Sequence, residues 1–188
     1  MRIFISGGCK NGKSTYAERI AKQQCMQPNP LYYIATMRAV DNEDTARISR
    51  HQTARDGMDF ITIEQPEVIE GILAKCDNNG SFLLDSLTAL LANEMFGVSG
   101  DYDGNACCRI SNGLTQILSQ INNIVIVSDY IYSDAMIYDP LTETYRKSLA
   151  TLDRLAAARC DVVLEATYTQ IIVHKGADIF REVQNAVS

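Results

Sequence analysis

The chain has 188 residues, of which 46% are hydrophobic and 21% are charged, an ordinary composition for a soluble globular protein. A chain of this length is expected to form one domain over residues 1–188. The formal net charge of −6 argues against the broadly basic surface that general nucleic-acid binding requires. No apolar run approaches the roughly 20 residues that span a bilayer, and the chain enters an apolar strand without a signal peptide. We therefore expect a cytoplasmic protein.

The cysteines and histidines do not form a metal-binding pattern. The six cysteines include no C-x-x-C pair, and the two histidines, His51 and His174, lie far apart in sequence. We therefore expect neither a structural zinc site nor a disulfide framework.

The first element of the chain is a phosphate-binding loop between a strand and a helix. Residues 2–6 are an apolar run typical of a buried strand, and residues 15–24 carry apolar side chains at helical spacing. Between them, G-G-C-K-N-G-K-S fits the pattern G-x-x-x-x-G-K-[ST] at every fixed position. Backbone N–H groups of such a loop bind phosphate oxygens, Lys13 reaches the outer phosphates, and the Ser14 hydroxyl is a ligand for Mg²⁺. The candidate nucleotide-binding residues here are Gly7, Gly8, Cys9, Lys10, Asn11, Gly12, Lys13, Ser14 and Thr15.

The alternative interpretation of this stretch is a glycine turn without a ligand. We favour the nucleotide site because motif and context agree. The prediction is a protein that binds GTP or ATP with Mg²⁺.

A charged segment at 41–55 follows the second predicted strand. Its acids gather at the start and its arginines toward the end, as in an α-helix. Helical spacing places Arg47, His51 and Arg55 along one side, with Arg50 beside them. Arginines around an imidazole suit a phosphate-bearing ligand, and a neutral imidazole can carry a nucleotidyl group. The alternative is a solvated helix face with an incidental histidine.

The remaining segments alternate between strand and helix patterns, which predicts an α/β fold with a mainly parallel sheet flanked by helices. The last two strands are close enough in sequence to form an antiparallel hairpin. Expected strands lie at 31–35, 60–63, 81–85, 124–128, 161–165 and 170–174, and expected helices at 66–76, 86–96, 106–120 and 142–159.

Ligands of such sheets bind at the carboxyl ends of the strands. The residues expected at these ends are Thr36, Glu64, Asp85 and Asp129. Asp85 is a candidate metal ligand or catalytic acid–base group, or alternatively the N-cap of the next helix. The same two interpretations apply to Asp129. His174, in a strand pattern, is interpreted as structural.

Several of these segments together resemble the bifunctional adenosylcobinamide kinase/adenosylcobinamide-phosphate guanylyltransferase family of cobalamin biosynthesis. Family-type motifs occur in order through the first half of the chain, and they are I-S-G-G at 5–8, Y-I-A-T at 33–36, A-R-I-x-R-H at 46–51, T-I-E-x-P at 62–66 and L-D-S-L-T at 84–88. The second half departs from the family pattern. Where the family has N-E-V-G and then G-I-V-P, this chain has S-D-Y-I-Y at 128–132 and A-M-I-Y-D-P at 135–140.

The resemblance implies a P-loop NTPase fold of the RecA-like type and a bifunctional transferase. By resemblance, His51 takes GMP from GTP, Lys13 and Asp85 complete the catalytic set, and Ser14 and Asp85 hold Mg²⁺. The implied nucleotide contacts beyond the loop are Thr36, Gln52 just after His51, Glu64 and Asp85. Helical spacing adds Arg47, Arg50 and Arg55 as candidate nucleotide-binding residues. The implied acceptor is a corrinoid, and the implied assembly is a homotrimer.

Two other functions stay open at this stage. One is a small-molecule kinase of another specificity, which would not need His51. The other is a non-catalytic nucleotide switch, in which residues 97–105 or the tyrosine-rich segment 129–141 bind a partner.

Overall fold

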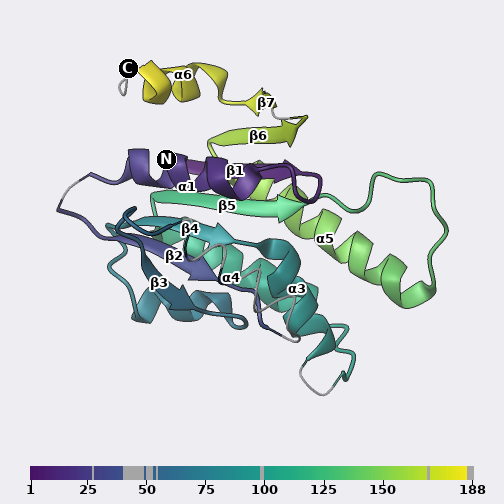
Figure 1. The fold of residues 1–188 in the computed structure, drawn as a ribbon. Coiled ribbons are helices and arrows are strands. Elements are labelled where there is room, and N and C mark those ends of the chain that lie inside the picture. The colour runs from purple at the N-terminus through teal and green to yellow at the C-terminus, as the bar shows by residue number, and fades with distance from the viewer. Residues whose placement is uncertain are drawn as a thin grey trace.

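The computed structural model describes residues 1–26, 28–39, 49, 53, 55–97, 100–168 and 170–185. At its centre is a seven-stranded sheet in the order β3-β2-β4-β5-β1-β6-β7 (Figure 1). The strands are β1 (Arg2–Gly7), β2 (Leu31–Ala35), β3 (Ile61–Glu64), β4 (Ser81–Asp85), β5 (Asn123–Asp129), β6 (Val162–Thr167) and β7 (Gln170–Lys175). All neighbouring pairs are parallel except β6 and β7, which form an antiparallel hairpin. The predicted α/β fold with a C-terminal hairpin is confirmed.

Each face of the sheet is covered by helices. The helices are α1 (Lys13–Gln24), α3 (Leu87–Phe96), α4 (Ala106–Gln120), α5 (Pro140–Arg159) and α6 (Ala177–Asn185), with a 3₁₀ helix η1 (Ile69–Ala74). Successive side chains of the central strands point to opposite faces. Phe4 and Ile126 therefore pack with α3, α4 and α5, whereas Ile5 and Val125 pack with α1 and α6. Burial on both faces explains why these strands are continuous apolar runs.

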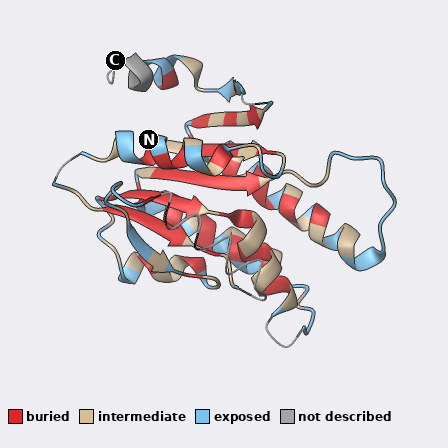
Figure 2. Cartoon of the chain, in the orientation of Figure 1, coloured by how far each residue is buried: buried red, intermediate tan, exposed pale blue. Residues whose placement is uncertain are grey.

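Burial falls from the centre of the sheet to its edges (Figure 2). β1, β2, β4 and β5 are almost entirely buried, while β3 and β7 are largely exposed. Among the described residues, no helix is both long enough and apolar enough to cross a membrane.

Most expected elements appear within one or two residues of their predicted bounds. α5 begins at Pro140 because the Asp139 side chain accepts hydrogen bonds from the backbone of Leu141 and Thr142, which makes Asp139 its N-cap. The sequence prediction missed α6. The helix expected at 41–55 lies almost entirely outside the described residues.

The helix predicted at 66–76 is wrong in extent, since only the short η1 forms there. Val68 has a left-handed φ of 49° directly before it, which a regular helix does not accommodate. The preceding carbonyls are bound by side chains: Gln65 Nε2 donates to the carbonyls of Glu67 and Val68, and Asn93 Nδ2 donates to that of Pro66. These bonds replace the ladder of an α-helix.

Candidate nucleotide site

The loop between β1 and α1 has the backbone that phosphate binding requires. At Gly7, a Cβ would lie 2.5 Å from the Ala166 carbonyl oxygen, so this position accepts only glycine. Gly12 has a left-handed φ of 85° and offers no side chain to cap α1. Because α1 begins at Lys13, directly after the loop, the positive end of its dipole lies at the loop. Asn11 ties the loop to β6, because its amide nitrogen donates to the Ala166 carbonyl.

Lys13 is buried within the loop and held by two acceptors. Its ammonium donates to the Gly8 carbonyl at 3.1 Å and forms an ion pair with Asp129 at the end of β5. The Asp129 backbone N–H donates in turn to Thr88 Oγ1 at 2.8 Å. Because β5 runs through Asp129 and Asp139 caps the next helix, Asp129 is not an N-cap. An incoming triphosphate would meet a lysine that is already paired with a carboxylate.

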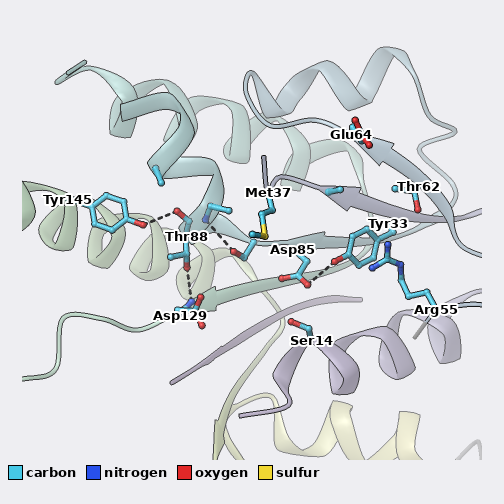
Figure 3. Close-up of a pocket in the computed structure, with 14 residues that line it drawn as sticks. Ser14, Tyr33, Met37, Arg55, Thr62, Glu64, Asp85, Thr88, Asp129 and Tyr145 are labelled. Carbon is cyan, nitrogen blue, oxygen red and sulfur yellow. Dashed lines mark hydrogen bonds between the residues drawn. The ribbon is translucent and has the colours of Figure 1, made fainter. Parts of the chain in front are cut away.

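A cavity of about 260 Å³ opens beside this loop, at the carboxyl ends of the parallel strands (Figure 3). Its lining residues are Ser14, Tyr33, Ala35, Met37, Arg55, Thr62, Glu64, Asp85, Ser86, Thr88, Ala89, Ala92, Asp129 and Tyr145. The cavity therefore brings together Ser14, Glu64 and Asp85, which the sequence placed in separate motifs.

One end of the cavity is lined by Tyr33, Arg55 and Asp85, and Glu18 lies behind Arg55. We call these four residues the Arg55 wall. The Arg55 guanidinium carbon lies 3.5 Å from the centre of the Tyr33 ring, a close cation–π contact. The Tyr33 hydroxyl donates to Asp85 Oδ2 at 2.9 Å. Behind them, Arg55 Nη1 lies 3.8 Å from Glu18 Oε1.

The Arg55 wall is buried enough to shift the pKa of two of its members. Burial raises the pKa of Glu18 to about 6, with Arg55 acting in the opposite direction and Asp85 adding to the rise. Burial, followed by the Asp85 charge, raises the pKa of Tyr33 above its usual range. Tyr33 is therefore a neutral donor to Asp85 at physiological pH.

The other end, which we call the Asp129 wall, consists of Thr88, Asp129 and Tyr145. The Tyr145 hydroxyl donates to the Thr88 carbonyl at 2.9 Å, so α5 is tied to α3 beside the cavity. Burial, followed by the charges of Asp129 and Asp153, raises the pKa of Tyr145. Tyr145 is neutral, and its ring borders the cavity (Figure 3).

The N-cap interpretation of Asp85 is wrong, because Ser86 caps α3 through a bond from Ala89 N to Ser86 Oγ. Asp85 and Ser14 both line the cavity. A carboxylate and a serine hydroxyl are oxygen donors of the kind that Mg²⁺ takes together with nucleotide phosphates. The residues present therefore fit Mg²⁺ at this position. Among the described residues, no group of three or more His, Cys, Asp or Glu side chains could hold a metal by itself.

The other predicted site residues lie in three kinds of place. Cys9, Lys10, Gly12 and Thr15 are exposed in or beside the loop. Thr36 is fully buried, and its hydroxyl exchanges hydrogen bonds with the Ser86 backbone, so it joins β2 to the start of α3. The predicted residues Arg47, Arg50, His51 and Gln52 lie outside the described residues.

Sequence reasoning missed several members of the site. Glu18 follows Ser14 by four residues on α1, and this spacing was a usable signal for a shared helix face. Tyr145 carried no signal in the sequence, since it reaches the cavity only through tertiary packing. Tyr33 belongs to the Y-I-A-T motif at 33–36, but the motif alone did not show that its side chain reaches the cavity.

The sheet, with its phosphate loop after the interior strand β1, defines the class: a protein of the P-loop NTPase fold. Two solved structures share this fold at low identity. One is the KaiC-like protein PH0186 from Pyrococcus horikoshii OT3, with a TM-score of 0.52 and 11% identity, covering 93% of this chain and 78% of that one. The other is an ATPase domain, with a TM-score of 0.52 and 12% identity, covering 94% of this chain and 77% of that one.

Sequence comparison is more specific. The profile of the family described as "CobU: Cobinamide kinase / cobinamide phosphate guanyltransferase" matches residues 3–170. The chain belongs to this family of transferases, as its motifs predicted.

Two curated relatives are similar to this chain over different lengths. The bifunctional adenosylcobalamin biosynthesis protein CobP of Pseudomonas aeruginosa is 29% identical over 166 residues, which cover 87% of this chain and 91% of that protein. The corresponding protein CobU of Escherichia coli is 31% identical over 104 residues, which cover 55% of each chain. The match thus spans only about half the length of the E. coli relative.

Proposed function

We propose that this chain phosphorylates the side-chain hydroxyl of a cobinamide-type corrinoid and then transfers GMP from GTP to the new phosphate. Family membership supports the reaction class. The observation that carries the proposal is a cavity lined by Ser14 and Asp85 beside the phosphate loop, with Lys13 paired to Asp129 at its wall. These residues offer a cation, a hydroxyl and a carboxylate at the point where a triphosphate on the loop would react.

In the kinase step, the corrinoid hydroxyl oxygen attacks the γ-phosphorus of the nucleotide, the bond to the β-phosphate bridging oxygen breaks, and the nucleoside diphosphate leaves. Lys13 neutralises charge on the outer phosphates after exchanging Asp129 for them. The released carboxylate of Asp129 lies in the cavity and can take the hydroxyl proton. Bound Mg²⁺, held by Ser14 and Asp85, would supply further charge neutralisation on the phosphates.

In the guanylyl step, we propose His51 as the nucleophile. One imidazole nitrogen attacks the α-phosphorus of GTP, and the bond to the pyrophosphate oxygen breaks. The corrinoid phosphate then attacks the same phosphorus, the phosphorus–nitrogen bond breaks, and the neutral imidazole returns. Arg55, at the cavity wall, would bind the nucleotide phosphates in both steps.

Labelling with GTP tests both steps. After incubation with GTP labelled at the α-phosphate, denatured wild-type protein is expected to retain acid-labile label, and His51→Ala is expected to retain none. GTP labelled at the γ-phosphate is expected to transfer label to added cobinamide with either protein. Equal α-label on both proteins would contradict the histidine route.

The same assay addresses the alternatives. Transfer of γ-label to other small hydroxyl compounds, without α-label on the protein, would indicate a kinase of another specificity. Tight binding of GTP without either transfer would indicate a nucleotide switch.

Three further expectations remain proposals, namely that residues 1–188 act as one domain, that the chain forms a homo-oligomer, and that it works in the cytoplasm. Light scattering at several protein concentrations tests the second. A single cooperative unfolding transition would support the first.

A further inference from the structure

Glu18 is a buried carboxylate that the proposed reactions leave without a role. It lies on α1, and it is 1% exposed. Ser14 precedes it by four residues, so both side chains lie on one side of the helix, with Ser14 nearer the loop. Glu18 is thus one helical turn from the phosphate site, on the side of α1 that faces the Arg55 wall.

The partner of Glu18 is the Arg55 guanidinium, which is 7% exposed. The two groups approach to 3.8 Å. Glu18 Oε1 and Arg55 Nη1 are both buried, and neither has a hydrogen-bond partner among the residues that the structure describes. A buried guanidinium without a carboxylate nearby would carry a large desolvation penalty, so the position of Arg55 depends on Glu18.

The Arg55 guanidinium also lies against the Tyr33 ring, and Tyr33 donates to Asp85. Phe60 packs edge-on against Tyr33 with ring centres 5.9 Å apart, which holds the ring in place. Glu18 from behind and Tyr33 from one face therefore fix the guanidinium as part of the cavity lining. A preorganised guanidinium loses less side-chain entropy when it binds a phosphate.

We propose that Glu18 is a positioning residue that holds the Arg55 guanidinium at the cavity wall for the phosphates of the bound nucleotide. This inference rests on the proposed function for the identity of the ligand. Glu18 does not line the cavity, so it acts only through Arg55. The ion pair without a hydrogen bond suits this role, because it orients Arg55 while leaving guanidinium N–H groups to the ligand.

A double-mutant cycle in the full chain tests the proposal, with the dissociation constant of Mg²⁺·GTP measured by calorimetry. Glu18→Gln keeps the shape of the side chain and removes its charge. We expect Glu18→Gln to weaken GTP binding by about tenfold. This is the size of one charge-assisted hydrogen bond, here the bond from Arg55 to a phosphate. Arg55→Met should weaken binding at least as much, and the double variant should be no weaker than Arg55→Met alone.

Glu94→Gln is the matched control, because Glu94 is another buried glutamate paired with an arginine, at 3.2 Å from Arg109, and lies outside the cavity. It should leave GTP affinity unchanged. If Glu18→Gln binds GTP as tightly as Glu94→Gln, or if its effect adds in full to that of Arg55→Met, the positioning role is wrong.

The double variant keeps the test independent of folding, since removing both members of a buried ion pair is often neutral for stability. In labelling kinetics, Glu18→Gln should raise KM for GTP about tenfold and leave kcat within about twofold, as expected for lost ground-state binding. If the wild-type protein forms no labelled species, the proposed guanylyl transfer is wrong. The dissociation constants of Mg²⁺·GTP for the variants still decide the role of Glu18.

Discussion

The Arg55 wall and the Asp129 wall border the same cavity, but their charges are compensated in different ways (Figure 3). In the Arg55 wall, Arg55 and Glu18 lie 3.8 Å apart and are both nearly inaccessible to solvent. In the Asp129 wall, the carboxylate pairs with Lys13, and its own backbone N–H is bound by Thr88. In the Arg55 wall, two buried side chains of opposite charge neutralise each other. In the Asp129 wall, the charges are held by an ion pair and a hydrogen bond to Thr88.

This difference has a consequence for ligand binding. The Arg55 wall is preorganised, since its cation is fixed before a nucleotide arrives. The Asp129 wall must rearrange, because Lys13 has to leave Asp129 to reach phosphates. We therefore expect substitutions in the Arg55 wall to change the stability of the protein and its nucleotide affinity together. Substitutions in the Asp129 wall should change how strongly Asp129 competes with the nucleotide phosphates for Lys13.

The largest effect is expected from Arg55→Met, which leaves Glu18 buried without its partner. Losing one member of a buried ion pair typically costs about 3–5 kcal/mol. Urea unfolding at pH 8 should show a loss of this size, and Glu18→Gln/Arg55→Met should recover most of it. The loss should shrink toward pH 4, where Glu18 is protonated. A loss of under about 1 kcal/mol at pH 8 would mean that the wall is not held by this pair.

The next effect concerns Asp153, a buried carboxylate of α5 that accepts the Tyr132 hydroxyl at 2.9 Å. Burial raises its pKa from 3.8 to about 6. Because the folded state binds this proton more tightly than the unfolded state, its stabilising contribution is complete below about pH 4 and is lost as the pH rises through 6.

Asp153→Asn should therefore remove roughly 2–3 kcal/mol of the stability difference between pH 4 and pH 8. Glu18→Gln, by the same reasoning from a pKa of about 6, should remove about 2 kcal/mol. Chemical unfolding at the two pH values measures both. An unchanged pH dependence in Asp153→Asn would show that this carboxyl is not shifted in the folded state.

Asp129→Asn should strengthen nucleotide binding, whereas Glu18→Gln and Arg55→Met should weaken it. Without the carboxylate, Lys13 has no competing anion, and the phosphates lose a repulsive neighbour. We expect GTP to bind about fivefold more tightly, which corresponds to ~1 kcal/mol. Phosphoryl transfer to cobinamide should nevertheless slow, because the proton acceptor is missing. Weaker GTP binding by this variant would show that the Lys13–Asp129 pair supports the site instead of competing with its ligand.

Tyr145→Phe should have the smallest effect. It removes one hydrogen bond, from the hydroxyl to the Thr88 carbonyl, and leaves the ring in place. The expected loss is about 1 kcal/mol in thermal or urea unfolding, with unchanged GTP affinity. A large loss of affinity would indicate that this hydroxyl contacts the nucleotide directly.

The sequence was sufficient for the parts of the molecule that depend on local patterns. The phosphate loop was predictable because Gly7, Gly12, Lys13 and Ser14 stand in fixed positions between a strand and a helix. The strand order was not predictable, because pairing β5 between β1 and β4 depends on packing between distant segments. Sequence patterns were less reliable for short segments: they did not predict α6, and they predicted a longer helix where η1 forms. Around η1, side chains such as Gln65 decide the backbone conformation.

The two walls show the same limit for the site. Asp85 and Glu64 were found because parallel strands bring their carboxyl ends to one edge. Tyr145 could not be found this way, since it reaches the cavity from the middle of the divergent second half, through the packing of α5 on α3. Asp129 was found as a strand end, but its pairing with Lys13 required the structure.

The most direct test of the account is a crystal structure with Mg²⁺ and a GTP analogue that cannot be cleaved between the α- and β-phosphates. We predict phosphates on the 7–14 loop, Lys13 moved from Asp129 to the phosphates, Arg55 in contact with the nucleotide, and a His51 nitrogen in line with the α-phosphorus. A nucleotide bound elsewhere, or one whose α-phosphorus lies beyond the reach of His51 with Arg55 making no contact, would contradict the account.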